Sequence, residues 1–424
     1  MQEQTLLELA TRPDGEVSRR RFLQFTGGGL AAAGWLNAIG AEADDLKKRN
    51  AACILVWLGG GPSQFETWDP KPGTANGGQT KAISTAASGI KIAEYWPKVA
   101  EVMKDVAIIR SLTSKEGNHE RATYQLHTGR APSGAVKHPN IGSVVAQELG
   151  QPAAELPNFV SVGETVGPGF LGVSAAPFVV NSPGELPANV AMTVSKERMA
   201  RRLELLKQEN EELAKGGAAQ IAAGQQGLYD QAARMVLSPK LKAFDLKTES
   251  DKLRDAYGRN GFGQGLLMAR RLVEAGVPFI EVRKGGWDNH GDLWKNVPRN
   301  AGEVDPGLAQ LIRDLKSHGL LDTTLVVCMG EFGRTPKVNE KGGRDHFPKA
   351  FSALVAGSGI KGGRVIGKTA DNGTEVADRP VSVPELFQTF CKALKLNPST
   401  EMVTPQGRPI KIVDEGKPVN ELFA

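Results

Sequence analysis

Five short runs rich in apolar and β-branched residues place the strongest limit on the fold of this chain. They cover residues 52–58, 106–111, 277–283, 323–329 and 351–356. Helix-like patterns separate them, notably at 140–149, 264–275, 306–318 and 383–395. Short apolar runs are typical of strands buried on both faces, and strands that alternate with helices favour a parallel sheet covered by helices on both sides. We therefore expect an α/β fold in which all five strands are parallel.

Two segments depart from this alternation. Residues 194–258 form long polar patterns of helical type that Gly216, Gly217 and Gly224 interrupt, and we interpret them as a helical insertion. Residues 59–90 are rich in Gly, Pro and Thr, which predicts a long functional loop. We expect Ser382 to cap the helix at 383–395, with Pro384 in its first turn.

The start of the chain has the pattern of an export signal. Residues 18–24 read Ser-Arg-Arg-Arg-Phe-Leu-Gln, which resembles a twin-arginine signal. A glycine-rich apolar run at 25–39 follows, and then Ala41-Glu42-Ala43, which has the small-x-small pattern of a cleavage site. A buried helix is the alternative, but the glycines of the run disfavour a helix interior. We predict a signal segment at 1–43 and one domain at 44–424. The twin-arginine translocase would then be a partner during export, and the protein would be periplasmic or extracellular.

Composition excludes some classes of function. The chain has 52 Lys and Arg against 47 Asp and Glu, and it has no basic run with interleaved aromatic residues, so we expect no nucleic-acid partner. The three cysteines lie in apolar runs or in a predicted helix, without the spacing of a zinc site: Cys53, Cys328 and Cys391. We expect buried thiols and no disulfides.

Acids and histidines are concentrated in three glycine-rich turns at 285–292, 330–336 and 343–347. The carboxyl ends of parallel strands meet at one edge of a sheet, and carboxylates with imidazoles are ligands for divalent cations. His346 must return to that edge through the long connection 332–350. We predict one Zn, Mn, Ca or Mg ion with Asp288, His290, Glu331 and His346 as ligands. Asp345 would be a further ligand or would lie next to one.

An alternative interpretation is that these residues serve only turns and helix caps. Asp and Asn are common in turns, and Glu331 would then pair with Arg334.

The same turns carry a family resemblance. Together with Gly-Gly-Gly-Pro-Ser at 59–63 and Asp-Pro-Lys-Pro at 69–72, the motifs Gly-Trp-Asp-Asn-His, Gly-Glu-Phe-Gly-Arg-Thr-Pro and Gly-Arg-Asp-His resemble domain-of-unknown-function family 1501. That family is grouped with the alkaline phosphatase and sulfatase superfamily. The resemblance implies an alkaline-phosphatase-like three-layer α/β/α sandwich with a mostly parallel central sheet. It also implies metal ligands at strand ends and ester hydrolysis.

Residues 126–132 look like the turn that closes the nucleophile-bearing helix of sulfatases, which puts the nucleophile position near Asn118 and His119. The chain departs from the superfamily pattern at several points. No cysteine has the setting that formylglycine formation needs. Glycines 59–61 replace the acid expected after the first strand, and Glu331 and Phe332 replace an Asp-His pair. A two-metal site therefore loses ligands, and one ion remains.

Two functions from different classes fit these residues. The first is an exported metal-dependent hydrolase of a phosphate or sulfate ester, which a polysaccharide could carry. In it His119 acts as nucleophile or as general base, Asn118, Arg121 and Arg334 assist, and Arg130 and Ser63 bind the anionic substrate. The second is a non-catalytic binding or assembly protein that keeps an anion or metal pocket, because no Ser, Thr or Cys nucleophile is evident.

Overall fold

The computed structural model of the protein describes residues 50–424, except 133, 135, 152, 188, 189 and 191–193. The signal segment expected at 1–43 lies outside the described residues. Residues 51–424 form one compact unit.

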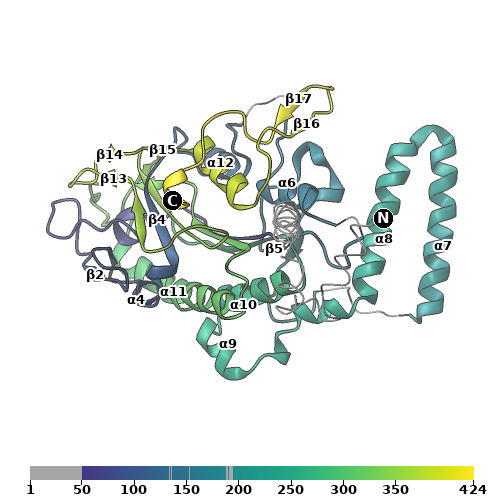
Figure 1. The fold of residues 1–424 in the computed structure, drawn as a ribbon, viewed down its shortest axis with the longest axis horizontal. Helices are drawn as coiled ribbons and strands as arrows, with labels where there is room; N and C mark the ends of the chain where they lie inside the picture. Colours follow the sequence, from purple (N-terminus) through teal and green to yellow (C-terminus); the bar gives the residue numbers. More distant parts are fainter. Residues whose placement is uncertain (1–49, 133, 135, 152, 188–189, 191–193) are drawn as a thin grey trace, which may run out of the picture. The chain divides into compact units, whose positions relative to one another are not determined.

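A nine-stranded sheet runs through this unit (Figure 1). Its order is β12-β4-β11-β8-β1-β7-β5-β6, with β15 beside β4. All five expected strands are present: β1 (Ala52–Leu58), β4 (Val106–Thr113), β7 (Phe279–Lys284), β8 (Thr324–Met329) and β11 (Phe351–Ala356). The sheet gains four short strands that the sequence did not predict: β5 (Phe159–Val162), β6 (Phe178–Val180), β12 (Arg364–Ile366) and β15 (Val381–Ser382).

The expectation that all five strands are parallel is wrong for β11, which runs antiparallel to both β4 and β8. No crossover helix joins β8 to β11. A small hairpin of β9 (Gly333–Arg334) and β10 (His346–Phe347) turns the chain back instead. A parallel return would need a crossover to the opposite edge. As a result β11 starts at the edge where β8 ends, and His346 stays at that edge without a return path.

Two apolar cores lie on opposite faces of the sheet. Along β1, Ile54 and Val56 enter one core and Leu55 and Trp57 enter the other, as strand geometry requires. The first core contains residues of α10 (Gly261–Glu274) and α11 (Leu293–Ser317). The second contains residues of α6 (Ile141–Glu148) and α12 (Val383–Ala393). Helices therefore cover both faces, and the expected three-layer α/β/α architecture with a mostly parallel sheet is confirmed.

The helices follow the expected pattern with one extension. Ser382 caps α12 in a capping box with Glu385, as predicted. By contrast, α11 begins at Leu293 rather than near residue 306, and it continues through Pro298 and Pro306. Its buried face, which includes Val297, Val304 and Leu308, outweighs the backbone hydrogen bonds that the prolines remove.

Residues of the expected insertion are helical. An antiparallel pair is formed by α7 (Lys196–Leu213) and α8 (Ala219–Leu237), which lie side by side (Figure 1). The turn between them, Ala214–Ala218, depends on Gly217 at a φ of 94°. The helix α9 (Asp251–Tyr257) follows. None of the helices in the described residues is both long and apolar enough to span a membrane.

Smaller elements complete the unit. They are α4 (Pro97–Glu101), α5 (His119–Thr128), β2 (Ala82–Ser84), β3 (Lys91–Ala93), β13 (Lys368–Thr369), β14 (Val376–Asp378), β16 (Glu401–Val403) and β17 (Pro409–Lys411). Short 3-10 turns join several of them. The three cysteines are buried and free.

A fully buried ion pair anchors the loop at 59–90. Arg344 Nη2 donates to Glu66 Oε1 at 2.9 Å and Arg344 Nε donates to Glu66 Oε2 at 3.1 Å. Thr80 also donates to this carboxylate, and the Arg344 guanidinium lies 4.3 Å from the centre of the Phe65 ring. This pair ties the long loop to the segment that carries Asp345 and His346.

We predict that Arg344→Ala lowers the free energy of unfolding by about 3–5 kcal/mol, because it leaves the Glu66 carboxylate buried without a counter-charge. Urea denaturation measures the change. The matched control is Arg259→Ala, which removes exposed ion pairs with Asp251 and Asp255 and should cost less than about 1 kcal/mol. Equal effects of the two substitutions would contradict a structural role for the buried pair.

Candidate functional site

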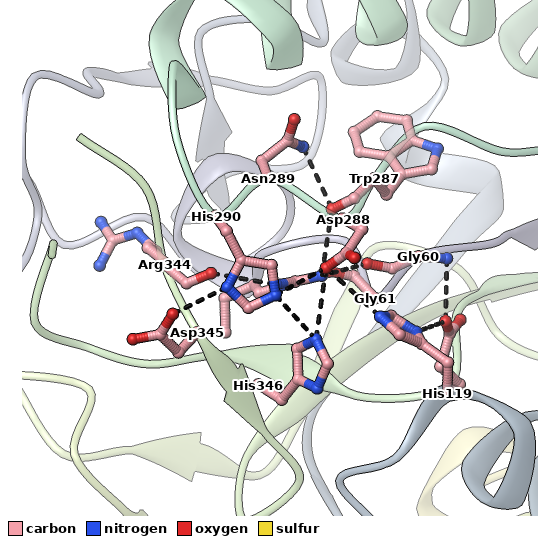
Figure 2. Close-up of polar contacts among 12 residues, drawn as sticks. Gly60, Gly61, His119, Trp287, Asp288, Asn289, His290, Arg344, Asp345 and His346 are labelled. Carbon is pink, nitrogen blue, oxygen red and sulfur yellow. Dashed lines mark hydrogen bonds and ion pairs between the residues drawn. The ribbon is translucent and has the colours of Figure 1, made fainter. Parts of the chain in front are cut away.

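Three imidazole rings meet at the carboxylate of Asp288 (Figure 2). The Nε2 atoms of His119, His290 and His346 lie 3.3, 3.0 and 3.3 Å from Asp288 Oδ1. His290 Nε2 and His346 Nε2 are themselves 3.0 Å apart. The residues come from the first turn of α5, the loop after β7, and β10, which all lie at one edge of the sheet.

The second nitrogen of each ring contacts a hydrogen-bond acceptor. His119 Nδ1 lies 2.6 Å from Glu331 Oε1, His290 Nδ1 lies 2.8 Å from Asp345 Oδ1, and His346 Nδ1 lies 2.7 Å from the Gly117 carbonyl oxygen. Because each acceptor takes a proton from Nδ1, the neutral form of each ring presents an Nε2 lone pair. Such partners typically orient histidine ligands of metals.

The centre of the cluster is rich in electron pairs. His119 Nε2 is buried without a hydrogen bond to any described residue. It forms a group with Asp288 and His346 whose ligand atoms all lie within 4.8 Å of one another. Several lone pairs and an anionic oxygen at such distances repel one another unless a cation or protons lie between them. These donor atoms therefore fit a divalent metal ion.

The guanidinium of Arg334 provides a positive charge next to the carboxylate of Asp288. Its side chain is fully buried, and its Nη2 atom donates to Asp288 Oδ1 at 2.5 Å. Burial would raise the pKa of Asp288, but this ion pair, assisted by His119 and His346, outweighs it and lowers the pKa to about 2. Asp288 is thus an anion at any physiological pH.

Glu331 lies behind His119. Its Oε1 atom accepts hydrogen bonds from His119 and from the Gly60 amide at 2.9 Å, and its Oε2 atom is buried without a partner among the described residues. The hydrogen bond to Glu331 raises the pKa of His119, against the opposing effect of burial. Glu331 therefore orients and polarises His119.

Glycines allow the loops to approach closely. Gly60 has a φ of 112°, and a Cβ atom there would lie 2.6 Å from the Asp288 amide nitrogen. A Cβ at Gly343 would lie 2.1 Å from the His290 carbonyl carbon. Phe332 packs against two of the imidazoles, with ring centres 4.8 Å from His119 and 4.6 Å from His346. These contacts restrict the rotation of both rings.

A cavity of about 730 Å³ opens beside His290 and Asp345. Its wall continues along the segment from Thr335 to Lys341 and includes Lys337 and Lys341. Neither lysine ammonium forms an ion pair with a described residue. The cavity therefore leads from solvent to the cluster past two lysines and one acidic side chain, that of Glu340.

The structure brings most of the predicted site residues together. Asp288 and His290, expected to share an ion, both reach the centre, as does His346. Asp345 contacts His290 and Glu331 contacts His119, so neither carboxylate reaches the centre, and the prediction of Glu331 as a ligand is not met. His119 faces the centre in the manner of a ligand, although the sequence predicted a catalytic role for it.

Four predicted residues lie elsewhere. Asn118 caps α5, where its side chain accepts from the Arg121 amide at 3.2 Å, and Arg121 pairs with Glu116 at 2.7 Å. Arg130 pairs with Asp414 and lines a separate cavity of about 460 Å³.

Ser63 is buried in the loop after β1, and its hydroxyl makes no hydrogen bond with a described residue. Arg334 is committed to Asp288 and to backbone carbonyls of Gly60, Gly61 and Arg344, so its guanidinium is not free for a substrate.

Sequence reasoning missed Phe332, Arg344 and the Gly117 carbonyl oxygen. The first two lie inside the quoted motifs, so the signal existed, but their contacts depend on long-range packing. The Gly117 carbonyl carries no side-chain signal at all.

Solved structures that resemble this fold share little sequence with it. A sulfatase from Pseudoalteromonas sp. is 14% identical with a TM-score of 0.38, over 84% of this chain and 70% of that chain. An alkaline phosphatase from the Antarctic bacterium TAB5 is 13% identical with a TM-score of 0.34, over 82% and 98%. A phosphonate monoester hydrolase of Agrobacterium radiobacter is 14% identical with a TM-score of 0.34, over 88% and 77%. The search of curated proteins found no match.

A protein-family model also matches most of the chain. The model described as "Protein of unknown function (DUF1501)" matches residues 50–423, which contain every motif on which the resemblance was based. Over this length the match shows the family, and the chain belongs to DUF1501.

Proposed function

We propose that this protein is a metal-dependent hydrolase of phosphate or sulfate esters. The observation that carries the proposal is the group of His119, Asp288 and His346, whose ligand atoms lie within 4.8 Å of one another. A metal held by these three side chains would keep a coordination position open for a substrate, as catalytic rather than structural sites do.

The donor set bears on the identity of the ion. Two imidazoles and one carboxylate suit Zn²⁺ or Mn²⁺ better than Ca²⁺ or Mg²⁺, which prefer oxygen ligands. When bound, such an ion supplies Lewis-acid polarisation of the ester oxygens. Arg334 keeps Asp288 ionised and in place for this role. Glu331 holds the ring of His119 in its orientation.

His290 and Asp345 form a pair that suits proton transfer. The cluster contains no hydroxyl or thiol side chain, which supports water as the nucleophile. In this scheme the water oxygen bonds to phosphorus or sulfur, the ester oxygen leaves, and His290 takes the proton from water and returns it to the leaving oxygen. Asp345 orients His290 through Nδ1, and that hydrogen bond lowers the pKa of Asp345.

The cavity beside His290 supports an extended anionic substrate. Its volume of about 730 Å³ exceeds what a single phosphate or sulfate needs, and Lys337 and Lys341 offer positive charge away from the cluster. We infer that the ester belongs to a multiply charged molecule, such as an anionic polysaccharide.

The twin-arginine pattern at 18–24 supports action outside the cytoplasm, in the periplasm or beyond. This route carries proteins that are already folded, which suits a site assembled from distant segments of the chain.

Elemental analysis of protein purified without chelator tests the metal. We expect about one divalent ion per chain in the wild type and background levels in His119→Ala and His346→Ala, because each substitution removes a ligand. The control is His318→Ala, since His318 is exposed and pairs with Glu274. A wild-type protein without metal would contradict the hydrolase proposal and favour the non-catalytic binding or assembly function.

Substitution of His290 separates proton transfer from metal binding. We expect His290→Gln to keep the metal and to lower kcat about 10²–10⁴-fold on p-nitrophenyl phosphate or sulfate, because the proton acceptor is lost. Asp345→Asn should reduce kcat less, since it only disorients His290. Loss of the metal in His290→Gln would show instead that His290 is a ligand.

The lysines of the cavity should affect substrate choice. For a multiply sulfated or phosphorylated oligosaccharide, we expect Lys337→Gln with Lys341→Gln to raise KM about tenfold, as loss of two charge contacts predicts. The KM for a p-nitrophenyl ester should not change. Lys361→Gln, in a different cavity, is the matched control. An equal rise in KM for both kinds of substrate would argue against this assignment.

A further inference from the structure

The helical pair of α7 and α8 carries a concentration of exposed apolar side chains. The described part of the chain exposes ten large apolar side chains, and six of them belong to these two helices: Leu205, Leu213, Ile221, Leu228, Tyr229 and Leu237. Leu205, near the middle of α7, is 61% exposed. Such exposed apolar side chains are available for contact with another molecule, and Leu205 is more exposed than Leu213, the other one on α7.

Leu205 points away from α8. Asn210 is buried between the helices and donates to Gln226 of α8 at 3.1 Å, so it marks the face of α7 that contacts its neighbour. Residues of an α-helix advance by about 100° each, which rotates Leu205 about 140° from Asn210. The face centred on Leu205 is therefore free of α8.

The charges on this face have opposite signs on the two sides of Leu205. Arg198 and Arg201 precede it by seven and four residues, and Glu209 and Glu212 follow it by four and seven. These spacings put all four within about 40° of Leu205 around the helix. All four are exposed.

Few intramolecular contacts use these charges. Arg198, Arg201 and Glu209 form no side-chain ion pair with a described residue. Glu212 pairs with Lys215 at 2.7 Å, and both of those side chains are mostly exposed, so this pair contributes little. The face is therefore available for contacts with another molecule.

We propose that this face of α7 binds α7 of a second copy of this chain, in an antiparallel pair with a twofold axis at Leu205. In such a pair each residue meets the one at the same distance on the other side of Leu205. Arg198 of one copy faces Glu212 of the other, Arg201 faces Glu209, and the two Leu205 side chains meet at the axis. A closed twofold contact of this kind uses the same surface on both subunits.

The symmetry of the pattern favours a second copy over other partners. The arginines would attract an acidic protein or an anionic lipid surface, but the glutamates would repel it. A basic partner would be attracted by the glutamates and repelled by the arginines. Only a surface with the same pattern in the opposite direction matches both halves. Charge pairs of this type set the register and orientation of an interface, while the apolar contacts supply affinity.

Light scattering coupled to size-exclusion chromatography tests the proposal on the full chain, which has a mass of 45.2 kDa. We expect the wild type to have the mass of two chains. Leu205→Asp should reduce the mass to that of one chain. Val403→Asp is the matched control, because Val403 is 65% exposed on β16, and this variant should stay dimeric.

Charge reversal tests the antiparallel register itself. A variant with Arg198→Glu and Arg201→Glu should be monomeric, and so should a variant with Glu209→Arg and Glu212→Arg, since like charges then face each other. Mixing the two monomers should restore the mass of two chains. A single chain with all four substitutions should also dimerise. All sites are exposed, so helical circular dichroism should be unchanged in each variant.

A monomeric wild type at tens of micromolar would overturn the proposal. A dimer that persists unchanged in Leu205→Asp and in both charge-reversed variants would overturn it as well, because its interface would lie elsewhere. Neither result depends on metal binding or on ester hydrolysis.

Discussion

One buried guanidinium holds the candidate site together. Arg334, just after β8, donates to the carbonyl oxygens of Gly60 and Gly61 after β1, to that of Arg344 in the hairpin loop, and to the Asp288 carboxylate after β7. A planar group with five N–H donors can satisfy acceptors on several loops at once, which a lysine cannot do. The guanidinium also compensates the charge of Asp288. The nitrogen lone pairs of the surrounding histidines can therefore lie close to the carboxylate in the absence of an ion.

The layers of the fold could be predicted from the sequence because burial leaves a clear pattern. Strands buried on both faces are apolar throughout, and β1, β7 and β8 matched their runs within two residues. The direction of β11 could not be predicted in this way, because an apolar run reads the same whichever way the strand points. Its direction depends on β9 and β10, which are two residues each and carry no strand-like pattern. The reversal matters for function because it leaves His346 at the same edge as Asp288.

The residue types of the candidate site were predictable, since histidines are few in this chain and two of them lie in glycine-rich turns. The partner of each side chain was not. Asn118, His119 and Arg121 are almost adjacent, but successive helical residues point in different directions, and only His119 faces Asp288. Glu331 has the chemistry of a ligand and yet lies behind His119, 212 residues away along the chain. Such pairings are set by tertiary packing, which local sequence does not encode.

The donor group of His119, Asp288 and His346 would also link a bound ion to the folding of the whole unit. Its members follow β4, follow β7 and precede β11, so they come together only when these strands have assembled in the sheet. An ion that binds only the complete group adds its binding free energy to the native state alone. Its loss would then destabilise the two apolar cores as well as the edge of the sheet. A chain without the bound ion would unfold and be degraded more readily. Occupancy of the site would therefore affect the lifetime of each molecule as well as its activity.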